Sequence, residues 1–352
     1  MGDGQIPLVN LAASVDDCAA AIGRACREHG FFYIREHGVS EDLQSRLALL
    51  SEQFFAWPES RKMQLAMVHG GLAWRGYFPV GGELTSGEPD LKEGIYFGAE
   101  LGPEHPLVQA KTPLHGANLF PDIPGFKSAV LDYIQSLTEL GHRLMQLISL
   151  SLGLEPSYFY QRYTNDPLVL LRLFHYPAEP DPTAVTRRPW GVGEHTDYGL
   201  LTILKQDQQG GLQVKSRGSW LEAPPLPGTF VCNIGDMLDR MTGGLYQSTP
   251  HRVRNVSGKS RYSVPFFFDP HVAAVVQAID VARAPHDDGD ERWDKANVHS
   301  FAGTYGDYRC RRWAVFFQHL ELASRVSRRT LFKTARKSIA VDLNHPASTV
   351  PM

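Results

Sequence analysis

The spacing of hydrophobic and polar residues changes along this chain of 352 residues. In residues 6–28, and again in residues 31–54, a short apolar run is followed by apolar positions at helical spacing. Ser14 and Ser40 stand where these two helices are expected to begin, and Gly30 is expected to stop the first helix. The beginning of the chain is therefore predicted to be a mixed α/β region.

Two further segments precede the change of pattern. Residues 69–125 are rich in glycine and proline, which predicts long loops over a surface, and loops of that length are more often functional than idle. From Phe126 to Leu152 apolar residues recur at helical spacing, which predicts one long helix with Gly141 as a candidate break.

After residue 160 the chain consists of short β-rich runs separated by Gly, Pro, Asn and Asp, a pattern typical of a sandwich or barrel. The number and closeness of these runs favour a jelly roll. The runs read LVLLRLFHY, LLTIL, GLQVK, TFVCNI, HRVRNV and RYSVPFFF. The expected fold class is mainly β with flanking helices, built on a jelly-roll core with an N-terminal α/β region.

The patterns divide the chain into four regions. These are an N-terminal α/β region with covering loops (1–125), a long helix (126–160), the jelly-roll core (161–275) and a C-terminal helical region with a basic tail (276–352). The tail, from about residue 320, has few apolar residues, which is typical of a solvated helix or a disordered segment.

The amino-acid composition limits the classes of protein to which this chain could belong. Apolar residues make up 43% of the chain, which is enough for a sizeable core, and the net charge of −3 argues against nucleic acid as a partner. The four cysteines form no Cys-x-x-Cys pair and no dense framework, which suits a reducing compartment. No apolar run approaches the roughly 20 residues that span a bilayer. We expect a soluble, cytoplasmic protein.

A candidate metal site begins in the segment WGVGEHTDYGLLTIL, where His195 and Asp197 are two positions apart. If the segment is extended, both side chains share one face of a strand, as two ligands of one ion would. An isolated His-x-Asp is more often a surface turn. His251, at the head of another β run, is a candidate third ligand. Two histidines and one carboxylate form the facial triad that leaves coordination positions open for oxygen chemistry.

Arg261 and Ser263 are also two positions apart in a predicted strand, so both project from one face. An arginine offers a rigid pair of donors to a carboxylate, and a serine adds a hydroxyl donor. Because an arginine that points into a barrel requires an anion, these two residues predict a carboxylate-bearing ligand.

With these residues in order, the chain resembles the isopenicillin N synthase-like branch of the Fe(II)/2-oxoglutarate-dependent oxygenases. The resemblance rests on His-Thr-Asp, on the later histidine of STPHRV and on Arg-x-Ser. Supporting motifs are GFFYIREHG (30–38), PGTFVCNIGD (227–236) and TYGDY (304–308). Their order and spacing are more specific than any one of them.

The resemblance implies that His195, Asp197 and His251 bind iron, and that Arg261 and Ser263 bind the distal carboxylate of 2-oxoglutarate. It also implies a double-stranded β-helix core and O2 as the oxidant. Fe(II) would be the metal cofactor and 2-oxoglutarate the cosubstrate, with a small molecule as the substrate.

One face of residues 168–176 offers further candidates. Tyr176 corresponds to the tyrosine of an Asn-x-Tyr motif that helps to hold the cosubstrate in many relatives, although Phe174 replaces the asparagine here. Arg172 is costly to bury alone, so it is expected to meet a carboxylate of the cosubstrate or substrate, or a nearby Asp or Glu.

Candidate substrate contacts lie in a segment, residues 75–98, that resembles the matching stretch of bacterial ethylene-forming enzymes. Tyr77 and Glu83 come from this segment, and Tyr198 follows the His-Thr-Asp motif. Phe267 has the same parity as Arg261 and would line the pocket. For each, an ordinary surface or packing role is the alternative.

Hydroxylation of a small organic metabolite, with release of succinate and CO2, is the reaction expected. Desaturation, ring closure and ethylene formation share its first steps. A 2-oxoglutarate-independent oxidase of the isopenicillin N synthase kind is the alternative among enzymes, because it also uses Arg-x-Ser. Outside the enzymes, the alternative is a metal-binding barrel that catalyses no reaction. The sequence identifies neither the substrate nor the oligomeric state.

Overall fold

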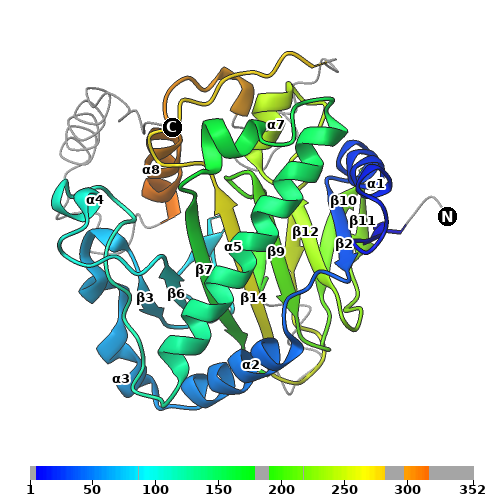
Figure 1. Ribbon diagram of the computed structural model, residues 1–352. Helices are drawn as coiled ribbons and strands as arrows, with labels where there is room; N and C mark the ends of the chain where they lie inside the picture. The colour runs from blue at the N-terminus through cyan, green and yellow to red at the C-terminus, as the bar shows by residue number, and fades with distance from the viewer. Residues whose placement is uncertain (1–4, 86, 179–189, 217, 282–296, 317–352) are drawn as a thin grey trace.

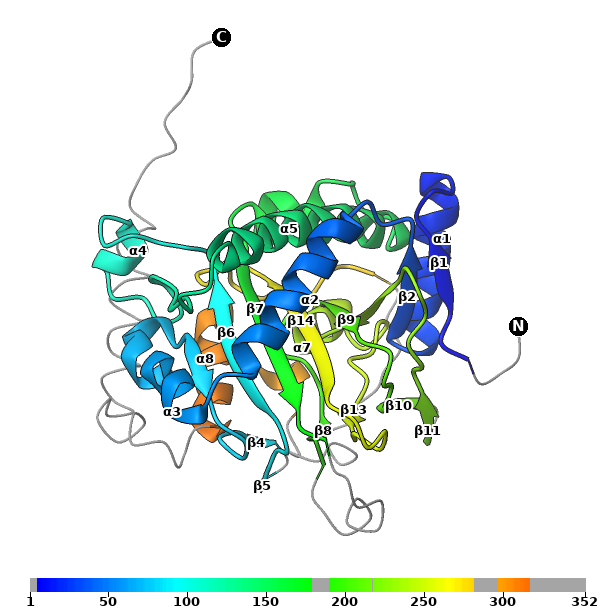
Figure 2. The ribbon, with the colours of Figure 1, turned by 90° about the horizontal axis from the view of Figure 1, so that it is seen from below.

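The computed structural model describes residues 5–85, 87–178, 190–216, 218–281 and 297–316. Within these residues, side chains from a large sheet and a smaller sheet line a cavity. Helices cover the opposite face of the large sheet (Figures 1 and 2). This is the expected fold class, mainly β with flanking helices. The strands of the described residues form open sheets and not a closed barrel.

The large sheet has the strand order β1-β2-β12-β9-β14-β7-β6-β3, and the pairs are antiparallel except for β1 with β2. Its strands are β1 (Leu8–Asn10), β2 (Phe31–Arg35), β12 (Phe230–Ile234), β9 (Leu201–Gln206), β14 (Arg261–Asp269), β7 (Leu168–Tyr176), β6 (Glu93–Gly98) and β3 (Gly76–Phe78).

The smaller sheet has the order β11-β10-β13-β8, and a two-stranded ribbon joins β4 to β5. The strands are β11 (Ser219–Glu222), β10 (Leu212–Ser216), β13 (His251–Val253), β8 (Val192–His195), β4 (Leu84–Thr85) and β5 (Glu88–Pro89). The six β-rich runs predicted from the sequence correspond to β7, β9, β10, β12, β13 and β14.

The helices are α1 (Val15–Glu28), α2 (Glu41–Phe55), α3 (Glu59–Lys62), α4 (Pro106–Gln109), α5 (Phe126–Ser151), α7 (Asp236–Thr242) and α8 (Tyr305–Phe316). Short helical turns are η1 (Met63–Leu65), η2 (Met67–Ala73), η3 (Tyr160–Thr164) and η4 (Val298–Ser300). Helix α5 lies across the large sheet and contacts β7, β9 and β14, while α1 and α2 pack against α5 (Figure 2).

The predicted helix starts are confirmed. The side chain of Ser14 accepts a hydrogen bond from the Asp17 backbone N–H at the start of α1, and Ser40 does the same for α2 with Leu43. Helix α1 ends at Glu28, just before Gly30, whose φ of 64° lies in the left-handed region that favours glycine.

The candidate break at Gly141 is wrong, because α5 is continuous from Phe126 to Ser151. Glycine has another purpose at this position. A Cβ atom on Gly141 would lie 2.5 Å from the ring of Phe268, a buried side chain of β14. The glycine therefore lets the helix approach the sheet closely.

The prediction of loops throughout residues 69–125 is also wrong in part. Strands β3 and β6 lie in this range and extend the large sheet, and all six residues of β6 are buried. The glycines that suggested loops allow close packing instead, since a Cβ on Gly94 would meet Phe78 and Phe174 at 2.7 Å.

Two sequence predictions concern other parts of the chain. In the described residues no helix is both long and apolar enough to cross a membrane. The basic tail from about residue 320 lies outside the described residues.

We expect Gly141→Ala to destabilise the protein, although alanine favours a helix by about 1 kcal/mol over glycine. The added methyl group would press on the Phe268 ring, and overpacking of a core costs about 1–3 kcal/mol. Urea unfolding measures the change. Asp132→Ala, at an exposed position of α5, is the control and should shift the free energy of unfolding by less than about 0.5 kcal/mol. A more stable Gly141→Ala protein would contradict this packing argument.

Candidate active site

His195 and His251 lie side by side on two neighbouring strands of the smaller sheet. His195 is the last residue of β8, and His251, the first residue of β13, is its direct partner in the antiparallel pairing. Their ring centroids are 4.2 Å apart. The pairing of two strand ends therefore brings together two imidazoles that are far apart in the sequence.

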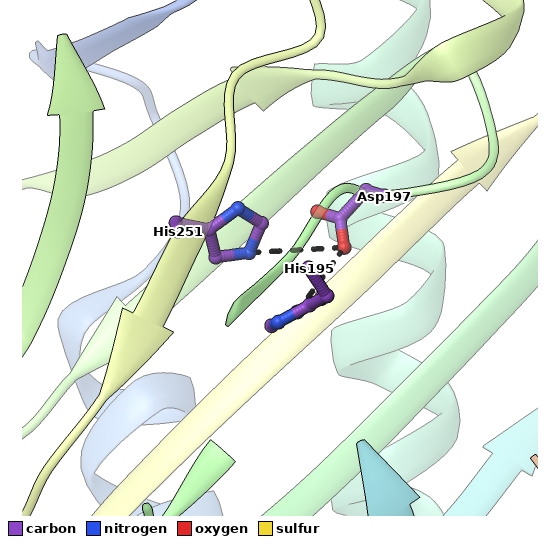
Figure 3. Close-up of side chains that lie close together, drawn as sticks. All are labelled: His195, Asp197 and His251. Carbon is purple, nitrogen blue, oxygen red and sulfur yellow. Dashed lines mark ion pairs between the residues drawn. The ribbon is translucent and has the colours of Figure 1, made fainter. Parts of the chain in front are cut away.

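Asp197 completes the group, but it does not lie in a strand as the sequence analysis expected. The strand ends at His195, so Asp197 lies in the turn toward β9 and not on the same face of an extended strand. Its Oδ1 atom is 3.9 Å from Nε2 of each histidine (Figure 3). One ligand atom from each of the three residues lies within 4.8 Å of the others, a spacing that a single metal ion can bridge.

Backbone carbonyls orient the two imidazoles. Nδ1 of His195 lies 2.8 Å from the Gly193 carbonyl oxygen, and Nδ1 of His251 lies 3.2 Å from that of Thr249. A carbonyl can only accept, so each Nδ1 carries a hydrogen, and in the neutral tautomer of each ring the lone pair is then on Nε2. Both Nε2 atoms face Asp197, as a metal site requires.

Two neutral side chains hold the carboxylate of Asp197. The Thr202 hydroxyl and the Asn233 amide donate to Oδ2 at 2.6 and 2.7 Å, which leaves Oδ1 facing the histidines. Thr202 in β9 and Asn233 in β12 are themselves direct cross-strand partners. The large sheet thus fixes the carboxylate, while the small sheet fixes the imidazoles.

The protonation states suit a divalent cation. Burial, followed by the neighbouring His251, lowers the pKa of His195 to about 3, so its imidazole is neutral at pH 7. Burial alone would raise the pKa of Asp197, but the two histidines and the hydrogen bonds from Asn233 and Thr202 hold it below its usual value. An anionic carboxylate beside neutral imidazole is the state that metal binding requires.

The three residues line a cavity between the two sheets, and a second candidate group lies at its floor. Ser263 and Tyr176 line this cavity, and Arg261 packs over the Tyr176 ring with its Cζ atom 4.7 Å from the ring centroid. Strand pairing places Arg261 directly opposite Tyr176, and Ser263 opposite Phe174.

Arg261 is fully buried and only partly satisfied. Its Nε donates to the Gly210 carbonyl at 2.6 Å and its Nη2 to Gln206 Oε1 at 3.3 Å. Its Nη1 has no hydrogen-bond partner in the described part of the chain. A buried guanidinium left in this state is costly, so the site fits an anionic ligand.

Two family models match the chain. One model, described as "non-haem dioxygenase in morphine synthesis N-terminal", matches residues 6–123. The other, the 2OG-Fe(II) oxygenase superfamily, matches residues 166–270. The chain belongs to the 2OG-Fe(II) oxygenase superfamily. It is therefore a dioxygenase of small molecules, whose family uses Fe(II), 2-oxoglutarate and O2, and the expected family and jelly-roll fold are confirmed.

Curated relatives include a probable iron/ascorbate oxidoreductase of Dictyostelium discoideum, 50% identical over 335 residues that cover 86% of this chain and 92% of the relative. A 1-aminocyclopropane-1-carboxylate oxidase of Dictyostelium mucoroides is 40% identical, and the match covers 86% of this chain and 93% of the relative. A homoarginine-6-hydroxylase of Oryza sativa subsp. japonica is 39% identical, and the match covers 74% of this chain and 79% of the relative.

Solved structures show the same fold. A full-length Neurospora crassa protein, crystallised in complex with alpha-KG and thymine, superposes with a TM-score of 0.73 at 29% sequence identity. The match covers 88% of this chain and 96% of that one.

In this oxygenase Arg172 is held between aromatic rings. Its Cζ atom lies 4.3 Å from the ring centroid of Tyr96 and 4.6 Å from that of Phe267, and all three side chains come from the large sheet. Its Nε has no hydrogen-bond partner, and it forms no ion pair among the described residues. The aromatic rings stabilise the cation but leave its donors available, since cation–π contact does not use them.

Another wall of the cavity carries paired charges. Lys92 Nζ donates to Glu83 Oε2 at 2.7 Å and also to Asp90 Oδ2. Thr85 donates to the same Asp90 oxygen, and the Tyr96 hydroxyl donates to Glu83 Oε1. Burial would lower the pKa of Lys92, but the two carboxylates raise it. Lys92 thus joins Glu83 to Asp90, and Arg172 is also close enough to Glu83 to hold the pKa of that carboxyl below its usual value.

The predicted substrate contacts separate into two groups. Glu83, Tyr198 and Phe267 line the cavity. Tyr77 does not line it, because its hydroxyl is buried and donates to Glu93 at 2.5 Å. Lys62 donates to the same Glu93 oxygen, so Tyr77 belongs to a separate buried cluster.

Sequence reasoning missed several residues of the cavity wall. Thr202 and Asn233 are polar residues in otherwise apolar central strands, and such buried polar groups require partners, which was the available signal. Lys92 sits in the segment that the glycine and proline pattern predicted to be loops. Arg309, in α8, directly follows the TYGDY motif, but its position over the cavity depends on how that helix packs.

Tyr77→Phe should lower the free energy of unfolding by about 1 kcal/mol, because it removes one buried hydrogen bond while Lys62 still pairs with Glu93. Urea unfolding measures this loss, and the affinities for Fe(II) and 2-oxoglutarate should not change. Tyr160→Phe, at an exposed tyrosine, is the matched control. Weaker ligand binding with unchanged stability would place Tyr77 in the site after all.

Proposed function

We propose that this oxygenase binds Fe(II) through His195, Asp197 and His251 and oxidises a small organic molecule with 2-oxoglutarate as cosubstrate. The observation that carries the proposal is the convergence of two Nε2 lone pairs and one carboxylate oxygen within 4.8 Å on the wall of one cavity. When bound, Fe(II), 2-oxoglutarate and O2 supply oxidising power, with succinate and CO2 released as a substrate C–H bond is oxidised.

Arg261, Ser263 and Tyr176 would hold the distal carboxylate of 2-oxoglutarate. The Nη1 atom of Arg261 is buried without a partner among the described residues, and Ser263 adds a hydroxyl on the same face of β14. Arg261 is already fixed by Gly210 and Gln206, so little side-chain freedom is lost when a carboxylate binds.

The chain's own residues supply orientation and a dry environment. Thr202 and Asn233 keep Asp197 Oδ1 turned toward the histidines, and the Gly193 and Thr249 carbonyls hold the two imidazoles with Nε2 toward Asp197. Apolar side chains complete the cavity and exclude water, which protects a reactive site from side reactions. They include Phe31, Val192, Leu204, Leu212 and Val253.

Hydroxylation is the outcome that we propose, and relatives named as homoarginine-6-hydroxylases support it. A second candidate is an oxidation that does not consume 2-oxoglutarate, which the 40% identity to a 1-aminocyclopropane-1-carboxylate oxidase favours. Measuring succinate against substrate consumed separates the two. Equal amounts support the dioxygenase, and substrate oxidation without succinate supports the oxidase.

We also propose a cytoplasmic location. The four cysteines support this location, because all of them are free and buried, as expected in a reducing compartment.

Replacing His195 or Asp197 by Ala should weaken Fe(II) binding by at least ten-fold, because each change removes one of three protein ligands. The fold should persist, since the cores of both sheets do not depend on these side chains. Equilibrium binding under anaerobic conditions measures the affinity, and circular dichroism measures the fold. Glu194→Ala, next to His195 but outside the metal group, is the control. Unchanged iron affinity in both ligand variants would exclude the assignment.

Arg261→Lys should raise the apparent KM for 2-oxoglutarate by about ten-fold, because the charge remains but the paired donors are lost. A lost charge-assisted hydrogen bond is worth about 1.5–3 kcal/mol, or about one to two decades in affinity. Ser263→Ala, which removes one neutral donor, should have a smaller effect. Succinate formation is followed during titration with 2-oxoglutarate at fixed Fe(II). A rise confined to the KM for the organic substrate would assign Arg261 to that substrate.

A further inference from the structure

The main chain of Asp197 is held differently from that of the two histidines. His195 and His251 lie at the ends of paired strands, whereas Asp197 belongs to the loop between β8 and β9, residues 196–200, which we call the metal loop. This loop contains Gly199, and a loop without strand pairing has more conformational freedom than a strand. The position of Asp197 therefore depends on what contacts the metal loop.

The start of α7 supplies the first set of contacts. Three consecutive backbone N–H groups donate to three carbonyl oxygens of the metal loop. The pairs are Gly235 with Leu200 at 3.1 Å, Asp236 with Asp197 at 2.7 Å, and Met237 with Gly199 at 3.0 Å. A Cβ atom on Gly235 would lie 2.5 Å from the Gly199 carbonyl oxygen, so a glycine allows this close approach. The main chain of the metal loop is thus held against the start of α7.

Strand β14 supplies the second contact. A Cβ atom on Gly199 would lie 1.4 Å from Oδ1 of Asp269, the last residue of β14. The main chain of the metal loop therefore packs directly against the Asp269 carboxyl. A shift of this carboxyl, or of the start of α7, would shift the loop.

Two tyrosine hydroxyls of α8 bind the carboxyl groups at these two contacts. Tyr308 donates to Oδ2 of Asp236, the first residue of α7, at 2.6 Å. Tyr305, one turn earlier in α8, donates to Oδ2 of Asp269. Both carboxyl groups are buried, and the Tyr308 ring also meets the Tyr198 ring of the metal loop, with centroids 6.3 Å apart. Through these residues, the TYGDY motif meets the end of the PGTFVCNIGD motif beside the metal loop.

We propose that Tyr305 and Tyr308 are positioning residues for the metal site, because they fix the loop that carries Asp197. Thr202 and Asn233 orient the Asp197 carboxylate, but its distance from the two imidazoles also depends on the main chain of the loop. Contacts behind metal ligands set the ligand geometry and so the affinity for the metal. The proposal rests on the proposed function, since it concerns the Fe(II) site assigned there.

The experiment compares the full chain with Tyr305→Phe, Tyr308→Phe and the double variant. Each substitution keeps the aromatic ring and removes only a hydroxyl group. Fe(II) binding is measured anaerobically without 2-oxoglutarate. Each single variant should weaken it about three-fold or more, and the double variant about ten-fold or more, because substitutions behind metal ligands typically cost at least about ten-fold. The KM for 2-oxoglutarate at saturating Fe(II) should not change, because Arg261 and Ser263 are not altered.

A spectroscopic measurement tests the geometry of the site directly. Co(II) is bound in place of Fe(II), since its visible absorption depends on the number and arrangement of its ligands. We expect the spectrum of the double variant to differ from that of the unmodified protein at saturating Co(II). A loss of stability alone would leave this spectrum unchanged.

Tyr246→Phe is the matched control. The Tyr246 side chain is also fully buried, and its hydroxyl lies 2.8 Å from that of Ser151 in α5, an element that supplies none of the contacts to the metal loop described above. This variant should lose stability but keep its Fe(II) affinity and its Co(II) spectrum. Thermal denaturation of the metal-free proteins checks that each variant is folded, and the single variants carry the test if the double variant unfolds.

Three results would overturn the proposal. These are an unchanged Fe(II) affinity in folded variants at both tyrosines, an equal loss of affinity in Tyr246→Phe, or a rise in the KM for 2-oxoglutarate as large as the loss of Fe(II) affinity. Failure of the proposed function is a different result. In that case the unmodified protein would fail to bind Fe(II), and the positioning role would fail with it.

Discussion

The candidate site depends on the antiparallel register of β8 and β13, which places His251 directly opposite His195. Side chains alternate between the faces of a strand, so a slip of one residue would turn one imidazole away from the other. The carbonyls of Gly193 and Thr249, each two residues before its histidine, then rotate both Nε2 atoms toward Asp197. Backbone pairing and backbone hydrogen bonds therefore set the geometry before any ligand binds.

Buried cations distinguish structural from binding positions in this fold. Lys62 is buried and has Glu93 at 2.6 Å, and Lys92 has two carboxylates, so both cations are compensated within the chain. Among the described residues Arg261 is buried without an anion, and Arg172 packs against aromatic rings without an ion pair. Because an uncompensated buried charge is destabilising, an anionic ligand at Arg261 would stabilise the site, and the half-buried Arg172 keeps donors that another anionic group could use.

Much of the fold was predicted from local sequence patterns, and each wrong prediction has a physical cause. Strand periodicity located the core strands, and side-chain oxygens at Ser14 and Ser40 located two helix starts. Gly94 and Gly141 suggested a loop and a helix break, but their role is close approach between elements, which depends on distant partners such as Phe268. Likewise, the grouping of His195, Asp197 and His251 was predictable from residue types and order, but the placement of Arg309 depends on the packing of α8.

Strand β7 shows why the site and the core of this oxygenase are inseparable. On one face Arg172, Phe174 and Tyr176 line the cavity. Across the strand, His175 contacts Glu93 at 2.7 Å and joins the buried cluster of Lys62 and Tyr77. The same alternation places His175 in this polar cluster, and its direct pairing with Glu93 fixes the register of β6 against β7. Replacement of His175, which lies on β7 itself, can therefore weaken ligand binding without any contact to the ligand, because a shift of β7 displaces the cavity wall, whereas loss of the Tyr77 hydroxyl leaves the contact between Glu93 and His175 in place.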